Sequence, residues 1–167
     1  LAAAAKTACP LLGSVSYYRG MTLLESAEAF FKKEQWVYDK AKDASVLRLG
    51  FDGKRGRWRC FLEVKEAVSH LIFFSLLEPA VPEKKRAEIS ELFHRINCRL
   101  NVGNFELNPD DGMGRFRSGI DVEGITDVTQ VVKNLALLNV ATMDKYLPSV
   151  NAVMQGETPL RALAAAD

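Results

Sequence analysis

The sequence predicts an α+β domain in which a twisted antiparallel sheet is flanked by helices, in the order α-β-β-β-α-β-β-α. Three observations predict it. Apolar residues recur at helical spacing in three separate segments, and strand-like alternation fills the segments between them. The connections between consecutive strand candidates are as short as hairpins, which antiparallel pairing permits and parallel pairing does not.

The first helix is expected to begin after Thr22. Glu25 follows Thr22 at the spacing of a capping box. Leu23, Ala27 and the pair Phe30–Phe31 then fall on one face of the helix.

Strands are expected next, over residues 45–51, 57–64 and 70–77. The first two alternate between apolar and polar residues and are separated by the glycine-containing turn 52–56. Residues 70–77 are apolar at nearly every position, which predicts a central strand covered on both sides. Residues 36–39 could add an edge strand.

The second half of the chain predicts a helix, a hairpin and a final long helix. The helix covers residues 82–100 and starts at a proline, whose missing N–H is not needed there. The hairpin joins residues 104–107 to 113–122. The final helix covers residues 126–155, and Pro148 inside it is expected to kink or split it.

Length and composition indicate a single globular domain. The chain has 167 residues, of which 48% are hydrophobic and 26% charged, and its net charge is +1. This size suits one core, and the charge gives no global attraction to nucleic acid or anionic lipid. We expect one domain over residues 21–163, a flexible leader over 1–20 and a tail over 164–167. No apolar run is long enough to span a membrane.

The three cysteines are Cys9, Cys60 and Cys98. Their odd number and wide spacing argue against a disulfide framework and predict a reducing, cytoplasmic location.

No catalytic, metal or cofactor site is predicted. In the loop 108–112 the carboxylates do not match the ligand spacing of a calcium loop, so we interpret it as a solvated turn. His94 and Cys98 make one loose pair, short of the four ligands of structural zinc, and packing is the favoured interpretation. We therefore expect no cofactor.

One basic cluster stands out. It comprises Lys54, Arg55, Arg57 and Arg59, with Arg48 expected nearby on the paired strand. Trp58 among arginines could form a stacking platform for single-stranded nucleic acid, but its alternation with apolar neighbours predicts burial.

Four segments together resemble the YbjN family, whose members are described as bacterial sensory transduction regulators. These are "VPEKKRAEISELFHRIN", "GNFELNPDDGMGRFR", "KYLPSVNAVMQG" and "GETPLRAL". The resemblance covers about residues 22–163. It implies a fold similar to type III secretion chaperones, which are often dimeric and bind extended segments of other proteins. It supplies no catalytic residues.

The first functional hypothesis is therefore a non-enzymatic protein-binding module, chaperone-like or regulatory, that self-associates as a homodimer and binds no membrane. The candidate partner surface comprises Arg48, Lys54, Arg55, Arg57, Arg59, Phe30 and Phe31. The alternative is nucleic-acid binding by the basic hairpin 48–59, which the sequence favours less than protein binding. A small-molecule enzyme of unknown type is a third hypothesis.

Overall fold

The computed structural model describes residues 20–41 and 45–165. The strands are β1 (Asp39–Lys40), β2 (Val46–Asp52), β3 (Arg57–Lys65), β4 (His70–Leu76), β5 (Asn104–Leu107) and β6 (Gly114–Asp121). The helices are α1 (Leu23–Lys33), α2 (Glu83–Asn97), α3 (Val128–Met154) and α4 (Pro159–Ala164), with a 3-10 turn at Glu66–Val68. The expected leader up to residue 19, Cys9 and residues 166–167 lie outside the described residues.

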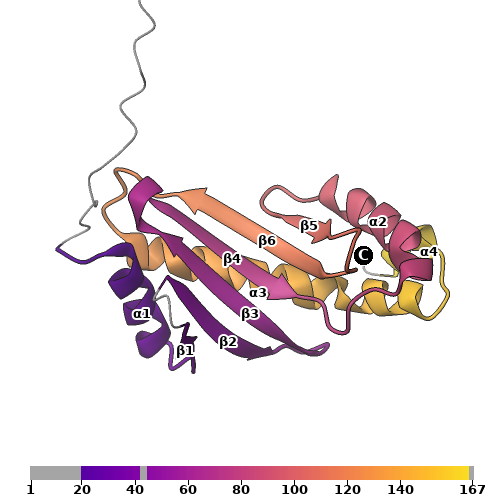
Figure 1. Cartoon of the computed structure of the whole chain (residues 1–167), viewed down its shortest axis with the longest axis horizontal. Helices are drawn as coiled ribbons and strands as arrows, with labels where there is room; N and C mark the ends of the chain where they lie inside the picture. The colour runs from indigo at the N-terminus through magenta and orange to yellow at the C-terminus, as the bar shows by residue number, and fades with distance from the viewer. Residues whose placement is uncertain (1–19, 42–44, 166–167) are drawn as a thin grey trace, which may run out of the picture.

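The strands form a six-stranded antiparallel sheet in the order β1-β2-β3-β4-β6-β5. In Figure 1, α3 passes behind the strands along the length of the sheet, and α1 and α2 lie at its two ends. The α+β fold with a helix-flanked antiparallel sheet is thus confirmed. No described helix is long and apolar enough to cross a membrane.

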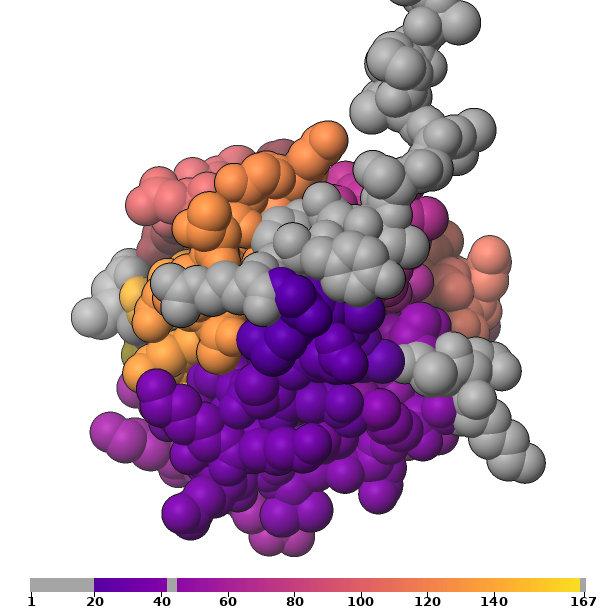
Figure 2. Space-filling model, turned by 90° about the vertical axis from the view of Figure 1, so that its left-hand side faces the viewer, coloured from indigo at the N-terminus to yellow at the C-terminus, as the bar shows by residue number. Residues whose placement is uncertain are grey.

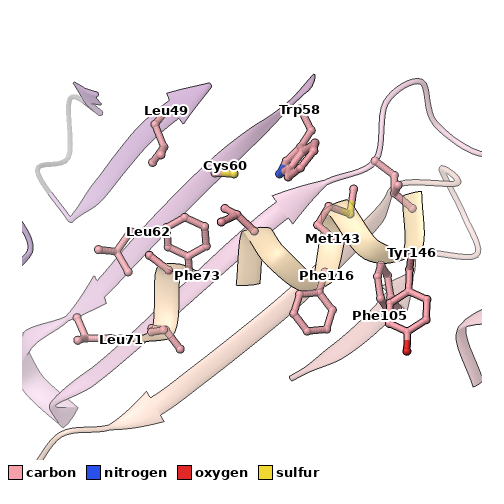
Figure 3. Packing of buried hydrophobic residues seen from close by; sticks show 14 of the residues in the cluster. Leu49, Trp58, Cys60, Leu62, Leu71, Phe73, Phe105, Phe116, Met143 and Tyr146 are labelled. Carbon is pink, nitrogen blue, oxygen red and sulfur yellow. The ribbon is translucent and has the colours of Figure 1, made fainter. Parts of the chain in front are cut away.

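The core lies between α3 and the sheet. Strands β2, β3, β4 and β6 contribute alternate residues to it, such as Cys60 and Leu62 from β3 and Phe73 from β4. Figure 3 shows Phe116 of β6 beside Phe105 and Tyr146 towards the other end of the sheet. Phe105 is 4.8 Å from Phe116 between ring centroids. This face of the sheet is therefore buried beneath α3.

Helix α1 begins as the sequence predicts. Thr22 and Glu25 form both hydrogen bonds of the capping box. In addition, the carboxylate of Glu66 accepts hydrogen bonds from the backbone N–H groups of Leu23 and Leu24, at 3.2 and 2.9 Å. A charged acceptor at a helix N-terminus satisfies free N–H groups and favours the helix dipole. This contact fixes α1 to the β3–β4 connection.

A buried polar network attaches α3 to the middle of the sheet. The side-chain amide of Asn139 donates to Ser118 Oγ at 2.9 Å and to the carbonyl of Phe73 at 3.0 Å. Its oxygen accepts from the Ser75 hydroxyl at 2.7 Å. Ser75 in turn accepts from the Trp58 indole N–H at 3.0 Å. These polar side chains are all buried and all paired, as a stable interior requires.

Three expectations need correction. The strand 70–77 is central, but its residues are buried only on one face, so it is not covered on both sides. Pro148 does not split the last helix, because its ring lies on the exposed side and water can satisfy the freed carbonyl. Helix α2 ends at Asn97 rather than residue 100. There the Asn97 side chain turns to bond the backbone N–H and C=O of Phe105.

We expect Asn139→Leu to lower the free energy of unfolding by about 1–3 kcal/mol, because it keeps the volume but leaves buried hydroxyl and carbonyl groups without a donor or acceptor. Asn134→Leu is the matched control, since Asn134 lies on the exposed side of the same helix. Its effect should stay within about 0.5 kcal/mol. Urea unfolding of both variants makes the comparison, and equal effects would contradict a structural role for the network.

Candidate functional site

The face of the sheet opposite α3 carries the candidate site, and we call it the open face. No described helix lies over it (Figure 1). At its centre are Phe61 of β3 and Ile72, Phe74 and Leu76 of β4, all partly exposed. We call these four residues the apolar ridge. Large apolar side chains gathered at the centre of an uncovered sheet are characteristic of a contact surface.

Arginines flank the apolar ridge in register. Arg48 pairs with Phe61, Phe61 with Phe74, and Phe74 with Arg117, so one row crosses four neighbouring strands. Directly paired side chains in such a row lie about 5 Å apart. The guanidinium of Arg115 lies over the Phe74 ring, 4.9 Å from its centroid. The ridge is thus bordered by cations on both sides.

Glu106 on the edge strand β5 holds two of these cations. Its carboxylate is 2.7 Å from the side chains of both Arg115 and Arg117. Burial raises the pKa of Glu106, but hydrogen bonds from Asn104 and Arg115, with the charges of both arginines, outweigh burial and leave the pKa below its usual value. Glu106 therefore remains ionised and orients this side of the face.

Two hollows lie on either side of the apolar ridge. The larger, of about 690 Å³, lies along β2 between Val37 and Gly50. The smaller, of about 330 Å³, lies along β6 and includes Gly119. Both glycines project towards the open face, and an added Cβ would meet nothing within 4 Å at Gly50 and only ordinary contacts at Gly119. The two glycines thus add no side chain to these hollows.

The basic hairpin is not one continuous patch. Arg55 docks on α3, its backbone N–H donating to Asp144 at 2.9 Å and its guanidinium to the carbonyl of Lys145 at 2.8 Å. On the open face, Arg57 pairs with Asp52 and Arg59 with Glu78. The structure therefore separates the cations of the turn from those of the sheet.

Three members of the basic cluster, Arg48, Lys54 and Arg55, form no ion pair with the described residues, and of these Arg55 is hydrogen-bonded to α3. Arg48 lies on the open face beside Phe61, whereas Lys54 lies in the exposed β2–β3 turn. Trp58 is in the core, as its alternation predicts, and cannot act as an exposed stacking platform.

Phe30 and Phe31 do not belong to an exposed partner surface. They are only 1% and 0% exposed. Both rings lie within 6 Å of Trp36, and Phe31 is also 5.5 Å from Tyr38. The apolar face of α1 is buried in the core, and α1 closes one end of the molecule (Figure 2). The helical stripe was predicted correctly, but its assignment to a surface was wrong.

The sequence did not single out the apolar ridge or the pair Arg115–Arg117. A signal for the ridge was present. In residues 70–77, both the odd-numbered and the even-numbered positions are mostly apolar. Because the described helices cover only one face of the sheet, the even-numbered set faces away from the core. Only the pairing of β6 with β4 shows that the arginines of β6 lie beside the apolar ridge.

The acidic loop is a turn, as expected. Asn108 and Asp111 each accept a hydrogen bond from the backbone N–H two residues on, at 3.0 and 2.8 Å. Gly112 adopts a positive φ of 76°, and Arg86 donates to the Pro109 carbonyl at 2.6 Å. Within the described ranges, no three metal-ligating side chains cluster.

Cys60 is buried, and desolvation raises the pKa of its thiol to about 11. Its sulfur is 3.4 Å from the Ser75 hydroxyl. Cys98 is exposed, with its sulfur 3.9 Å from His94 Nε2.

We expect iodoacetamide at pH 8 to modify Cys98 readily and Cys60 hardly at all until the protein unfolds. With a pKa of about 11, roughly one Cys60 thiol in a thousand is ionised at that pH, and burial blocks access as well. Peptide mass spectrometry in buffer and in denaturant measures each site separately. Rapid native modification of Cys60 would contradict the packing described above.

Comparison with known proteins gives a family and a fold. The family model YbjN, described as "Putative bacterial sensory transduction regulator", matches residues 24–141. A crystal structure of "YbjN, a putative transcription regulator from E. coli" is similar with a TM-score of 0.54 and 10% sequence identity, covering 85% of this chain and 92% of that one. At this identity the likeness concerns the fold.

A chain from the HopA1–SchA chaperone–effector complex gives a TM-score of 0.47 with 14% identity, over 71% of this chain and 88% of that chain. No curated protein sequence is significantly similar to the chain.

Proposed function

The chain belongs to the YbjN family, and from this premise we propose that it is a non-enzymatic protein-binding module, chaperone-like or regulatory, whose open face contacts the partner. The observation that carries the proposal is the apolar ridge, whose four large side chains lie at the centre of a sheet face that no described helix covers. Burying such a surface against a partner is favourable at roughly 25 cal/mol per Å² of apolar area.

The composition of the open face also supports a protein partner. Aromatic and arginine side chains are enriched where proteins contact one another, and here two phenylalanines lie between two arginines in the row from Arg48 to Arg117. Three strand spacings separate the ends of this row, or about 14 Å. The complementary partner segment presents apolar side chains in the middle and carboxylates on either side.

The nucleic-acid alternative has weaker support. Arg57, Arg59, Arg115 and Arg117 on the open face all have carboxylate partners, which reduces the local positive potential that phosphate binding requires. Lys54 and Arg55 in the turn are too few to follow a phosphate backbone. The protein alternative uses the same arginines but also accounts for the apolar ridge.

Self-association is a further part of the proposal and derives from the resemblance to often-dimeric chaperones. Sedimentation velocity over a hundredfold range of protein concentration tests it. We expect the sedimentation coefficient to rise towards that of a dimer, and a value that stays at that of the monomer would remove this part of the proposal.

We expect the double variant Phe61→Ser/Phe74→Ser to lose proteins that the wild type captures from a lysate of its source cells, or to bind them at least about tenfold more weakly, because central aromatic side chains dominate interface energies. The control, Leu137→Ser/Leu160→Ser, removes two side chains that are also exposed but lie on α3 and α4.

Unfolding midpoints establish that both double variants are folded. A second variant, Arg48→Glu/Arg117→Glu, leaves the ridge intact and should also weaken capture. Capture that is unchanged in both open-face variants, or lost equally in the control, would rule out the open face as the contact surface.

A further inference from the structure

The edge strand β1 covers only part of β2. β1 begins at Asp39, which pairs with Arg48. The part of β2 between Arg48 and the β2–β3 turn is therefore not paired with β1. The same register continued by two residues would set Val37 opposite Gly50. No hydrogen bond joins these two residues, and Val37 is 88% exposed. The larger hollow of the open face occupies the place of this missing pair.

Gly50 and Asp52 direct backbone hydrogen-bonding groups towards the missing strand. Successive residues of a strand point their N–H and C=O groups to opposite edges. Val46 accepts a hydrogen bond from Ala41 on the β1 side, at 2.9 Å. Gly50 and Asp52 have the same parity as Val46, so their groups face that side too. In the described part of the chain these groups have no hydrogen-bond partner there.

The hollow beside this edge has a volume and an apolar lining that suit a peptide. Its volume of about 690 Å³ lies within the range of about 300–1,000 Å³ typical of ligand sites. Val37 and the Phe61 ring supply apolar lining, and Gly50 leaves the floor free of a side chain. The hollow can therefore hold side chains of an added segment, and a single Cβ added at Gly50 would meet nothing within 4 Å.

The charges of the lining favour an acidic occupant. Two arginines, Arg48 and Arg59, line the hollow, and Asp39 is the one acidic residue of its lining. Arg59 is paired with Glu78, whereas Arg48 has no ion-pair partner in the parts of the chain that the structure describes. Arg48 is thus available to a carboxylate of the occupant.

We propose that an extended segment of a partner protein adds to the sheet as a short strand at Gly50 and Asp52. Its backbone takes up the free N–H and C=O groups, an acidic side chain meets Arg48, and an apolar side chain lies against Val37 and Phe61. The inference rests on the proposed function and specifies one mode of binding within it. Strand addition of this kind obtains affinity from the backbone and selectivity from the adjacent side chains.

The test uses the full chain and a fluorescent peptide of alternating acidic and apolar residues, Ac-GEVEVEVG-NH2, with Ac-GKVKVKVG-NH2 as the charge control. Gly50→Pro removes the outward N–H, which the β2–β3 ladder does not use, and proline is tolerated at such edge positions. We expect binding to weaken about tenfold or more, the effect of losing a backbone hydrogen bond. Gly50→Ala keeps the N–H and should bind within about twofold of the wild type.

Amide exchange gives a second readout that does not depend on a variant. The Gly50 amide should exchange rapidly in the free protein and slow at least about tenfold when the acidic peptide binds. Arg48→Gln should weaken the acidic peptide and leave the basic one unchanged. Absence of binding by the acidic peptide, equal binding by the proline and alanine variants, or a Gly50 amide already protected in the free protein would overturn strand addition.

The same titration separates this inference from the proposed function. If Phe61→Ser/Phe74→Ser abolishes peptide binding while Gly50→Pro leaves it unchanged, strand addition is wrong and the open face still binds. If the ridge variants capture the same proteins from the lysate as the wild type but the peptide binds at Gly50, strand addition is supported and the function proposed for the apolar ridge is wrong.

Discussion

The side chain of Asn139 is the constraint on which the rest of the molecule depends. It connects α3 to β4 and β6 through a serine from each strand and the backbone carbonyl of Phe73. A buried amide is costly unless all its groups are paired, and this placement of the helix pairs both the oxygen and the nitrogen of the amide. That placement spreads α3 along the middle of the sheet and commits one face to the core.

A single helical layer leaves the other face to water. The central strands nevertheless carry Phe61, Ile72 and Phe74 outwards, which is unfavourable for an isolated protein. The arginines beside them reduce the exposed apolar area with their aliphatic stems, and Arg115 lies over the Phe74 ring. Glu106 holds two of these arginines without covering the ridge. The arginines thus reduce the contact of the apolar ridge with water, while part of the ridge remains exposed.

Local patterns sufficed to predict most elements. The Thr22–Glu25 spacing located the start of α1, and alternation in residues 57–64 identified β3 with Trp58 and Cys60 inward. Features set by packing could not be predicted in the same way. Phe30 and Phe31 form an apolar stripe whether or not a neighbour buries it, and only the three-dimensional arrangement of α1 shows that they lie in the core.

The candidate site escaped prediction for the same reason. Arg48, Phe61, Phe74 and Arg117 are distant in sequence and become one row only through the pairing of β2, β3, β4 and β6. The gap at Gly50 likewise depends on β1 beginning only at Asp39, and no local sequence pattern indicates that starting point. Local sequence patterns therefore predict helices and strands well, whereas the residues that share a surface depend on how the strands pair.

The central claim is that the open face contacts protein partners, and site-specific photo-crosslinking tests it most directly. A benzoylphenylalanine in place of Phe74 on the open face and one in place of Leu160 on α4 are compared in the source cells, both positions being accessible to solvent. Discrete protein crosslinks from position 74 and none of the same species from position 160 are the predicted result. Crosslinks from position 160 with none from position 74 would contradict the account.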